Sequence, residues 1–223
     1  MIPRALKRLL HRATLKDPAY RFLFAPGPPG EAVAFDCETT GLDWRRDDIC
    51  SIAAVRIKGD RILTSERFEA VARPRAEMRA EAIKVHLLRE SDVEIGAPIE
   101  TVIPRFLAFI GGRPLVGYYL EFDVGMVNKY LRGLLGIELP NPMIEVSKLY
   151  YERKYGDAPP GSVIDLSFRA ILNDLDLPAL DQHDAFNDAL MTGMMYLKLR
   201  DLKERGVRIA RLRDVEEPQT TLA

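Results

Sequence analysis

The sequence predicts an α/β domain built on a mixed β-sheet. Three strand-like segments occupy the first third of the chain, and helix-like segments then alternate with a short apolar segment at 115–119. Strands that come first, followed by helices alternating with short strands, are typical of α/β proteins. At 223 residues, the chain is long enough for one domain with short extensions.

Residues 1–24 predict a short basic helix ahead of this domain. Leu6, Leu9 and Leu10 stand at helical spacing, and the segment holds six basic residues against a single acid, a net charge of +5. Residues 25–30 read Ala-Pro-Gly-Pro-Pro-Gly, which continues neither a helix nor a strand ladder. The expected division of the chain is an N-terminal extension and linker at 1–30, the domain at 31–204 and a C-terminal tail at 205–223.

The strands are predicted from short apolar runs. Residues 32–38 form such a run that ends in acids, as expected for a buried strand. Residues 49–57 and 62–71 predict two more strands, and the turn sequence Lys-Gly-Asp at 58–60 joins them into a hairpin. The segment 115–119 predicts a further short strand.

The helices are predicted from apolar residues at helical spacing. Paired glycines at 111–112 stop the helix that begins at Pro98, and Gly136 ends the next one. The predicted helices span 80–89, 98–110, 122–135, 144–155, 163–174 and 184–204.

Charge and composition narrow the function. The chain has 32 basic and 33 acidic residues, a net charge of −1, and a pI near 6.3. Proteins that coat long duplexes are usually strongly basic, so the charge argues against that class. It is compatible with a protein that binds a short end of a nucleic acid. Two cysteines, Cys37 and Cys50, are too few for a zinc cluster or a disulfide scaffold. With no apolar run near the roughly 18 residues of a membrane span and no secretion signal, we expect a cytoplasmic protein without a membrane partner.

Two acids stand at the end of the first predicted strand. Asp36 and Glu38 are two residues apart, so their side chains share one face. Neighbouring carboxylates at the end of an apolar strand are costly unless a cation neutralises them, and Mg²⁺ and Mn²⁺ prefer such oxygen ligands. An Asp-x-Glu triplet also arises by chance about once in a chain of this length, so the pair alone leaves both interpretations open.

Further candidates occur near two predicted helix N-termini. His183 and Asp188 would not share a face of one helix, because five residues turn through about 500°. If both act at one site, His183 must lie in the loop before the helix and fold back, and Asp184 is a candidate for the cap or the first turn of that helix. Asp188 begins an apolar stretch, where an inward carboxylate needs a partner. Asp123, taken alone, is as well explained by the helix dipole.

Together these residues resemble a known family. They occur in the order and spacing of the DEDD-type 3′→5′ exonucleases of the DnaQ-like family, in the subgroup whose third motif contains a histidine. Residues 36–42, Asp-Cys-Glu-Thr-Thr-Gly-Leu, resemble the family's D-x-E-T-T-G-L, and residues 183–189 match H-x-A-x-x-D-A. The resemblance covers about residues 32–200. The residues that carry it are Asp36, Glu38, Asp123, His183 and Asp188.

The second motif of the family matches only in part. Gly117, Phe122 and Asp123 are present, but Tyr118 and Tyr119 stand where the family usually has His-Asn. The replacement puts substrate contact and specificity in question more than metal binding.

The resemblance implies an RNase H-like fold, with a mixed five-stranded sheet whose first three strands are antiparallel. It also implies two divalent ions, Mg²⁺ or Mn²⁺. Asp36, Glu38 and Asp188 would ligate them, with Asp36 bridging. Asp123 would help to hold the second ion, and His183 would be the general base that takes a proton from the attacking water.

Contacts to the substrate follow from the same resemblance. For His86 a structural role also stays open, because a satisfied structural histidine is the commoner case. The residues expected to contact the terminal nucleotide are Thr39, Thr40, Gly41, Leu42, His86, Tyr118, Tyr119 and Phe122.

The expected function is metal-dependent 3′→5′ exonuclease action on single-stranded ends, releasing nucleoside 5′-monophosphates. DNA is the expected substrate, and RNA or oligoribonucleotides are the alternative, because recognition of the 2′-OH has no readable signature here. A catalytically idle module that binds nucleic acid or a polymerase is a second alternative, and the competent residues at all five positions argue against it. The basic N-terminal segment is the expected contact for a polymerase, another protein partner or nucleic acid, and an extension that is disordered or packs on its own domain is an equal alternative.

Overall fold

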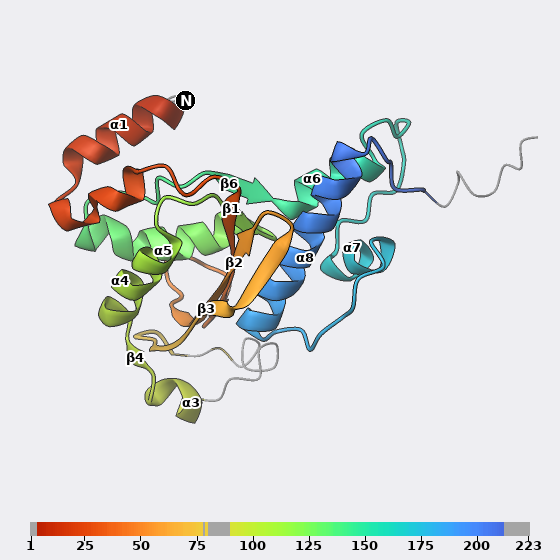
Figure 1. Cartoon of the computed structure of the whole chain (residues 1–223). Helices are drawn as coiled ribbons and strands as arrows, with labels where there is room; N and C mark the ends of the chain where they lie inside the picture. Colours follow the sequence, from red (N-terminus) through yellow and green to blue (C-terminus); the bar gives the residue numbers. More distant parts are fainter. Residues whose placement is uncertain (1–3, 78, 80–89, 212–223) are drawn as a thin grey trace, which may run out of the picture.

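The computed structural model describes residues 4–77, 79 and 90–211, and in these residues a six-stranded mixed sheet is flanked by helices (Figure 1). The strand order is β4-β3-β2-β1-β5-β6. The first three strands pair antiparallel, as predicted, and the remaining neighbours pair parallel. The strands are β1 (Glu31–Thr39), β2 (Ile49–Lys58), β3 (Arg61–Arg73), β4 (Ala97–Pro98), β5 (Leu115–Gly117) and β6 (Met143–Glu145).

The sheet has one strand more than the five expected. β4 is two residues long and β6 is three, and both lie at its edges. β6 occupies part of the segment 144–155, all of which the sequence assigned to a helix. A strand of three residues shows no usable period, so its apolar residues cannot be separated from those of the helix that follows.

The described helices that the sequence predicted differ from it only at some of their ends, whereas the short helices α3 and η1 were not predicted as separate elements. The expected helix at 80–89 lies outside the described residues. The helix expected over 163–174 begins only after Ser167, whose side chain accepts a hydrogen bond from the N–H of Ala170 and so caps it. The helices are α1 (Arg4–Thr14), the 3₁₀ helix η1 (Pro18–Phe24), α3 (Glu90–Glu94), α4 (Ile99–Ile110), α5 (Leu120–Leu134), α6 (Val146–Lys154), α7 (Phe168–Asp174) and α8 (Ala185–Glu204).

Helices cover both faces of the sheet, and β1 contributes side chains to each face in alternation. Phe35 and Cys37 pack into the core formed with α4 and α5. Ala34 packs into the core formed with α6, α7 and α8. Asp36 and Glu38 continue the alternation on this second face, so the pleat of β1 directs both carboxylates toward α8.

α8 crosses this face of the sheet at close range. A Cβ at Gly193 would lie 3.2 Å from Cδ1 of Ile62 and 3.6 Å from Cβ of Ala34, so the helix backbone approaches the strands more closely than a larger residue would allow. Asp188 precedes Gly193 by about one and a half turns. The first turn of α8, which carries Asp188, lies at the end of β1 that carries the two acids.

The basic N-terminal helix expected from the sequence is present as α1, and its cations face the domain. Lys7 Nζ lies 2.5 Å from a carboxylate oxygen of Glu138. The guanidinium of Arg8 donates to the backbone carbonyls of Phe24 and Pro140, at 2.7 and 3.0 Å. Phe24, in η1, is itself buried in the core. α1 is thus packed against the domain beside the segment that follows α5.

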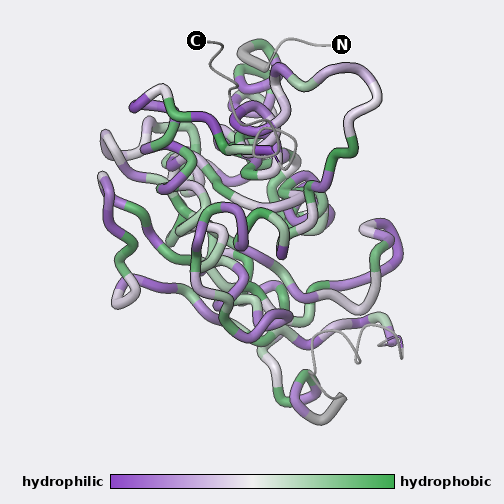
Figure 2. Tube along the Cα trace, turned by 90° about the vertical axis from the view of Figure 1, so that its right-hand side faces the viewer, coloured by the Kyte–Doolittle hydropathy of each residue, from purple (hydrophilic) through white to green (hydrophobic). Residues whose placement is uncertain are grey.

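Hydrophobic and hydrophilic residues are interspersed along the coloured part of the trace (Figure 2). No helix among the described residues has the length and apolar character needed to cross a membrane.

Candidate active site

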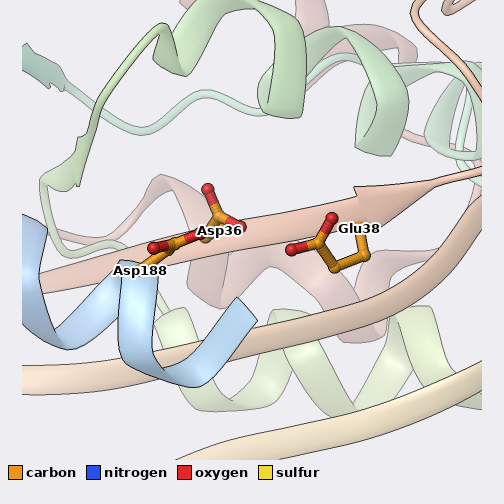
Figure 3. Close-up of side chains that lie close together, drawn as sticks. All are labelled: Asp36, Glu38 and Asp188. Carbon is orange, nitrogen blue, oxygen red and sulfur yellow. The ribbon is translucent and has the colours of Figure 1, made fainter. Parts of the chain in front are cut away.

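Three carboxylates from distant parts of the chain converge at the end of β1. Asp36 and Glu38 extend from the strand, and Asp188 reaches them from the first turn of α8 (Figure 3). One carboxylate oxygen of each lies within 4.8 Å of the other two. The i and i+2 spacing on β1 and the packing of α8 are together sufficient to explain this arrangement.

His183 lies in the loop before α8 and turns back toward the site. Its backbone is left-handed, with φ 67°, and its N–H donates to Oδ2 of Asp188 at 3.0 Å. Asp184 caps the helix by accepting a hydrogen bond from the N–H of Asn187. This is the geometry that the sequence requires if His183 and Asp188 belong to one site.

Asp123 belongs to the same cavity but not to the group of three. It lies in the first turn of α5 and is 4% exposed. The backbone N–H of Cys37 donates to its carboxylate. Asp123 therefore approaches β1 from the α5 side of the sheet, whereas Asp36 and Glu38 face α8, and in this structure its oxygens lie outside the close cluster.

The acids of the cluster are largely withdrawn from solvent and face one another, and this raises their pKa values. Burial is the largest cause for Asp36, whose pKa is well above the ordinary value, and repulsion from Asp123 and Glu38 adds to it. Burial and then repulsion from Asp188 raise the pKa of Glu38 from 4.5 to about 7. Burial also raises the pKa of Asp188, against the lowering effect of the hydrogen bond from His183.

One buried carboxylate oxygen of the cluster accepts no hydrogen bond from the described residues. Oδ1 of Asp188 is buried and has no hydrogen-bond partner in the part of the chain that the structure describes. Buried carboxylate oxygens are nearly always paired, and each unpaired one is costly. Hard oxygen donors that repel one another and lack protein donors are what Mg²⁺ or Mn²⁺ takes as ligands, so these residues fit a divalent cation.

The cluster opens into a cavity of about 1080 Å³. One side is aromatic, formed by Tyr118, Tyr119 and Phe168, and Leu42 projects nearby with 85% of its surface exposed. Ligand pockets commonly measure about 300–1,000 Å³, so this cavity is large enough for more than a small ion or metabolite.

The structure separates the expected substrate contacts into two groups. Leu42, Tyr118, Tyr119 and Phe122 line the cavity. Thr39, Thr40 and Gly41 are buried beside it and are not among its lining residues in the described part of the chain.

The threonine hydroxyls of this first motif serve the loop itself. Thr39 donates to the carbonyl of Gly41 at 2.7 Å, and the Thr40 hydroxyl accepts from the N–H of Asp48 at 2.9 Å. His86, the remaining expected contact, lies outside the described residues.

The sequence analysis did not identify two residues that help to form this cavity. Glu145 lines it and accepts hydrogen bonds from the backbone N–H groups of Leu120 and Ser147, so it links the starts of α5 and α6. Its position just before a helix was the available signal, because a side-chain acceptor there can cap the first turn. Phe168 had no such signal, because an aromatic residue at a helix start is equally typical of the core.

The comparison with known families agrees with the site. The family model described as "Exonuclease" matches residues 33–196, which include all five residues singled out from the sequence. The chain belongs to the exonuclease family. The predicted enzyme class, a hydrolytic exonuclease of DnaQ-like type, is thereby confirmed for the domain.

Curated relatives of this exonuclease domain are bacterial DNA polymerase III proteins. The DNA polymerase III subunit epsilon of Aquifex aeolicus is 31% identical over 171 residues, which cover 76% of this chain and 80% of the relative. The PolC-type DNA polymerase III of Thermotoga maritima is 25% identical over 212 residues, 92% of this chain and 14% of the relative. The PolC-type protein of Caldanaerobacter subterraneus is 31% identical over 180 residues, 80% of this chain and 12% of the relative. The chain therefore spans about one-seventh or less of these PolC-type relatives.

Solved structures show the same fold. Exonuclease X in complex with 5′ overhanging duplex DNA has a TM-score of 0.58 at 24% identity, covering 82% of this chain and 98% of that chain. The zinc-bound complex of Escherichia coli exonuclease I with single-stranded DNA has a TM-score of 0.66 at 15% identity, covering 80% and 42%. The predicted RNase H-like α/β fold of the exonuclease domain is confirmed.

Proposed function

We propose that this exonuclease domain removes nucleotides one at a time from single-stranded 3′ ends and releases nucleoside 5′-monophosphates. The observation that carries the proposal is the convergence of Asp36, Glu38 and Asp188 with His183 in one cavity, where one buried carboxylate oxygen has no partner among the described residues. The order of these residues along the chain agrees with the 3′→5′ subgroup that the sequence resembles.

Divalent cations complete this proposed site. Asp36, Glu38 and Asp188 would hold Mg²⁺ or Mn²⁺, and Asp123, in the same cavity, would help to hold a second ion. When bound, such ions lower the pKa of an attacking water and stabilise negative charge on the leaving oxygen. The chain's own contribution is to keep these acids buried and close together, so that their repulsion is relieved only when cations bind.

His183 is proposed as the general base. Its side chain lines the cavity and is exposed, so it can take a proton from a water in the cavity and pass it to solvent. The hydrogen bond from its own backbone N–H to Asp188 keeps the loop beside the cluster. His183 is thus tied to the carboxylates through its main chain, while its imidazole remains free to act.

DNA is the proposed substrate, and RNA is the alternative. The named relatives are DNA polymerases, and the titles of structural neighbours describe complexes with DNA. No described contact distinguishes the two sugars, so the first experiment compares matched strands.

The test is a gel assay on 5′-labelled single-stranded DNA and RNA of one sequence, with Mg²⁺ or Mn²⁺. We expect a descending ladder that EDTA and Asp188→Asn both abolish, with nucleoside 5′-monophosphates as the chromatographed product. A folded, metal-supplied protein that degrades neither strand would overturn the proposal in favour of an idle binding module. A ladder on RNA alone would reassign the substrate.

We also propose that α1 is the contact for a polymerase. Leu6, Leu9 and Leu10 form one stripe of α1 and are 48%, 63% and 47% exposed, while Lys7 and Arg8 are engaged with the domain. Apolar residues at this spacing are how amphipathic helices enter the groove of a partner protein. Co-purification with the polymerase of the same organism should be lost on changing the three leucines to glutamate, with nuclease activity retained. Unchanged co-purification would overturn this assignment.

A further inference from the structure

Tyr119 adopts a backbone conformation that its residue type disfavours. It is the residue that precedes α5, and its φ and ψ of 52° and 36° are left-handed. Asparagine, the usual residue of the resembled family at this position, tolerates that region because its short polar side chain can bond locally, whereas a bulky residue there is an outlier. The chain thus retains an aromatic ring at a strained position.

Burial of the ring does not account for this. Tyr119 is 62% exposed, so most of its surface gains nothing from the core. Its ring centroid lies 4.5 Å from that of Tyr118, at an interplanar angle of 59°, and both rings line the cavity. Residues held in sparsely populated backbone regions cluster at ligand sites, and the exposed ring is directed to such a site here.

The residues behind Tyr119 are anchored. The Tyr118 hydroxyl donates to the backbone carbonyl of Leu166 at 3.0 Å. The ring of Tyr118 meets Phe168 edge to face, with centroids 5.1 Å apart and planes at 79°. Tyr118, Tyr119 and Phe168, which we call the aromatic wall, therefore join the start of α5 to the start of α7. The same cavity contains Asp36, Glu38 and Asp188.

We propose that Tyr119, supported by the rest of the aromatic wall, stacks on the base of one of the last nucleotides of the substrate. The ring would recognise the flat face of an unpaired base. This inference rests on the proposed function. Every base presents a π-face, so such a subsite accepts all bases and either sugar. It requires an unpaired base, because a base within a duplex already uses both faces for stacking.

The kinetic test compares 3′ ends that differ only in the base. The wild type should show its lowest KM on a terminal purine, a higher KM on a pyrimidine and the highest on an abasic tetrahydrofuran end. Tyr119→Ala should raise KM on the purine end roughly 5- to 150-fold, as loss of one base–aromatic stack does, with kcat within about threefold. It should leave the abasic KM nearly unchanged, and Tyr119→Phe should rescue the purine KM.

Two further variants separate recognition from folding. Tyr119→Asn relieves the left-handed strain, so it should be at least as stable as the wild type and still show the raised KM. Tyr151→Ala is the matched control, since Tyr151 is a 38% exposed tyrosine of α6 outside the residues that line the cavity. Equal wild-type KM values for purine and abasic ends, or a Tyr119→Ala defect confined to kcat, would overturn the proposal.

A binding readout without hydrolysis keeps this proposal distinct from the proposed function. In EDTA, an oligonucleotide with 2-aminopurine at its 3′ end should lose fluorescence when it binds the wild type, and the loss should be much smaller with Tyr119→Ala. Quenching in a protein that cleaves no strand would support base stacking on Tyr119 and overturn the proposed exonuclease activity. Hydrolysis with identical quenching in both proteins would do the reverse.

Discussion

Two groups of carboxylates in this domain are largely withdrawn from solvent, and their surroundings differ. Asp47 and Asp48, in the loop before β2, are 3% and 4% exposed. Asp48 accepts hydrogen bonds from two backbone N–H groups, from the ammonium of Lys129 at 2.6 Å and from the hydroxyl of Tyr130 at 2.9 Å. Asp36, Glu38 and Asp188 instead face one another.

The difference appears in the pKa values. Burial raises the pKa of Asp48, but its hydrogen bonds more than offset that, and the pKa lies below 3.8. In the cluster at β1, burial and mutual repulsion act in the same direction and the pKa values rise. Asp48 has donors for both of its carboxylate oxygens, whereas Oδ1 of Asp188 has none among the described residues. Satisfaction of the carboxylate, rather than burial, distinguishes a structural acid from a functional one.

The largest expected effect comes from Asp188→Asn. Losing one ligand of the proposed cation site should lower the rate of nucleotide release by about 10³- to 10⁵-fold, because a catalytic cation contributes several kcal/mol. Thermal stability without metal should stay equal or increase, since one buried charge is removed. Single-turnover assays and a melting curve measure both. Asp48→Asn is the matched control and should keep its activity per folded molecule, and equal activity losses in the two variants would contradict the comparison.

A smaller loss is expected for His183→Asn. Asparagine tolerates the φ of 67° and keeps the N–H that donates to Asp188, so the variant removes only the proposed general base. Its rate should fall roughly 10²- to 10⁴-fold. Its melting temperature should still rise with Mn²⁺. A full rate in this variant would exclude His183 as the base.

Metal should stabilise the protein through the unsatisfied cluster. At a free concentration about 100 times the Kd, a bound cation adds about 2.7 kcal/mol, which corresponds to a rise of roughly 5–10 °C in Tm for a protein of this size. Differential scanning fluorimetry with Mn²⁺ against EDTA measures the rise. It should vanish in Asp188→Asn and persist in Asp48→Asn. A wild-type Tm that is the same with Mn²⁺ as with EDTA would contradict the proposed cation site.

Asp48→Asn should destabilise the fold. The amide keeps some hydrogen bonds but loses the charge that pairs with Lys129, and hydrogen bonds to charged groups contribute about 1.5–3 kcal/mol each. We expect the free energy of unfolding in urea to fall by about 1–3 kcal/mol, whereas Glu38→Gln in the other group should not lower it. A stable Asp48→Asn variant would show that Asp48 is not the structural acid inferred here.

The two groups should respond to pH with opposite signs in metal-free protein. Glu38 has a folded pKa raised from 4.5 to about 7, so its contribution to stability is full below about pH 4.5 and is lost as the pH rises through 7. The folded pKa of Asp48 is lowered, so its contribution is present above 3.8 and is lost as the pH falls through the folded value. Urea unfolding from pH 3 to 8 should show both declines. Glu38→Gln should make the first decline smaller, because the raised pKa values of Asp36 and Asp188 remain, and Asp48→Asn should remove the second. A Glu38→Gln curve parallel to wild type between pH 5 and 7 would refute the assignment.

Local rules were sufficient for much of the fold and for part of the site. The period of two along β1 placed Asp36 and Glu38 on one face, and turn chemistry placed the hairpin of β2 and β3. The argument that His183 must precede the helix is confirmed by α8, which begins at Ala185, and of the two positions open to Asp184 the structure shows the cap. The short strands β4 and β6 were missed because segments of two or three residues have no measurable period.

The sequence by itself determined the α/β class, the order of the elements, the family and the acids of β1, because these depend on residue type, period and spacing along the chain. Only the tertiary structure decided which acids meet. The first turn of α8 brings Asp188 to Asp36 and Glu38, while Asp123, in the first turn of α5, lines the same cavity outside the close cluster. It also decided that Asp48 has donors, that Glu145 links two helix starts and that Tyr119 is strained and exposed. The physical reason is that hydrogen-bond partners, burial and repulsion depend on distances between residues far apart in the chain, which no local pattern encodes.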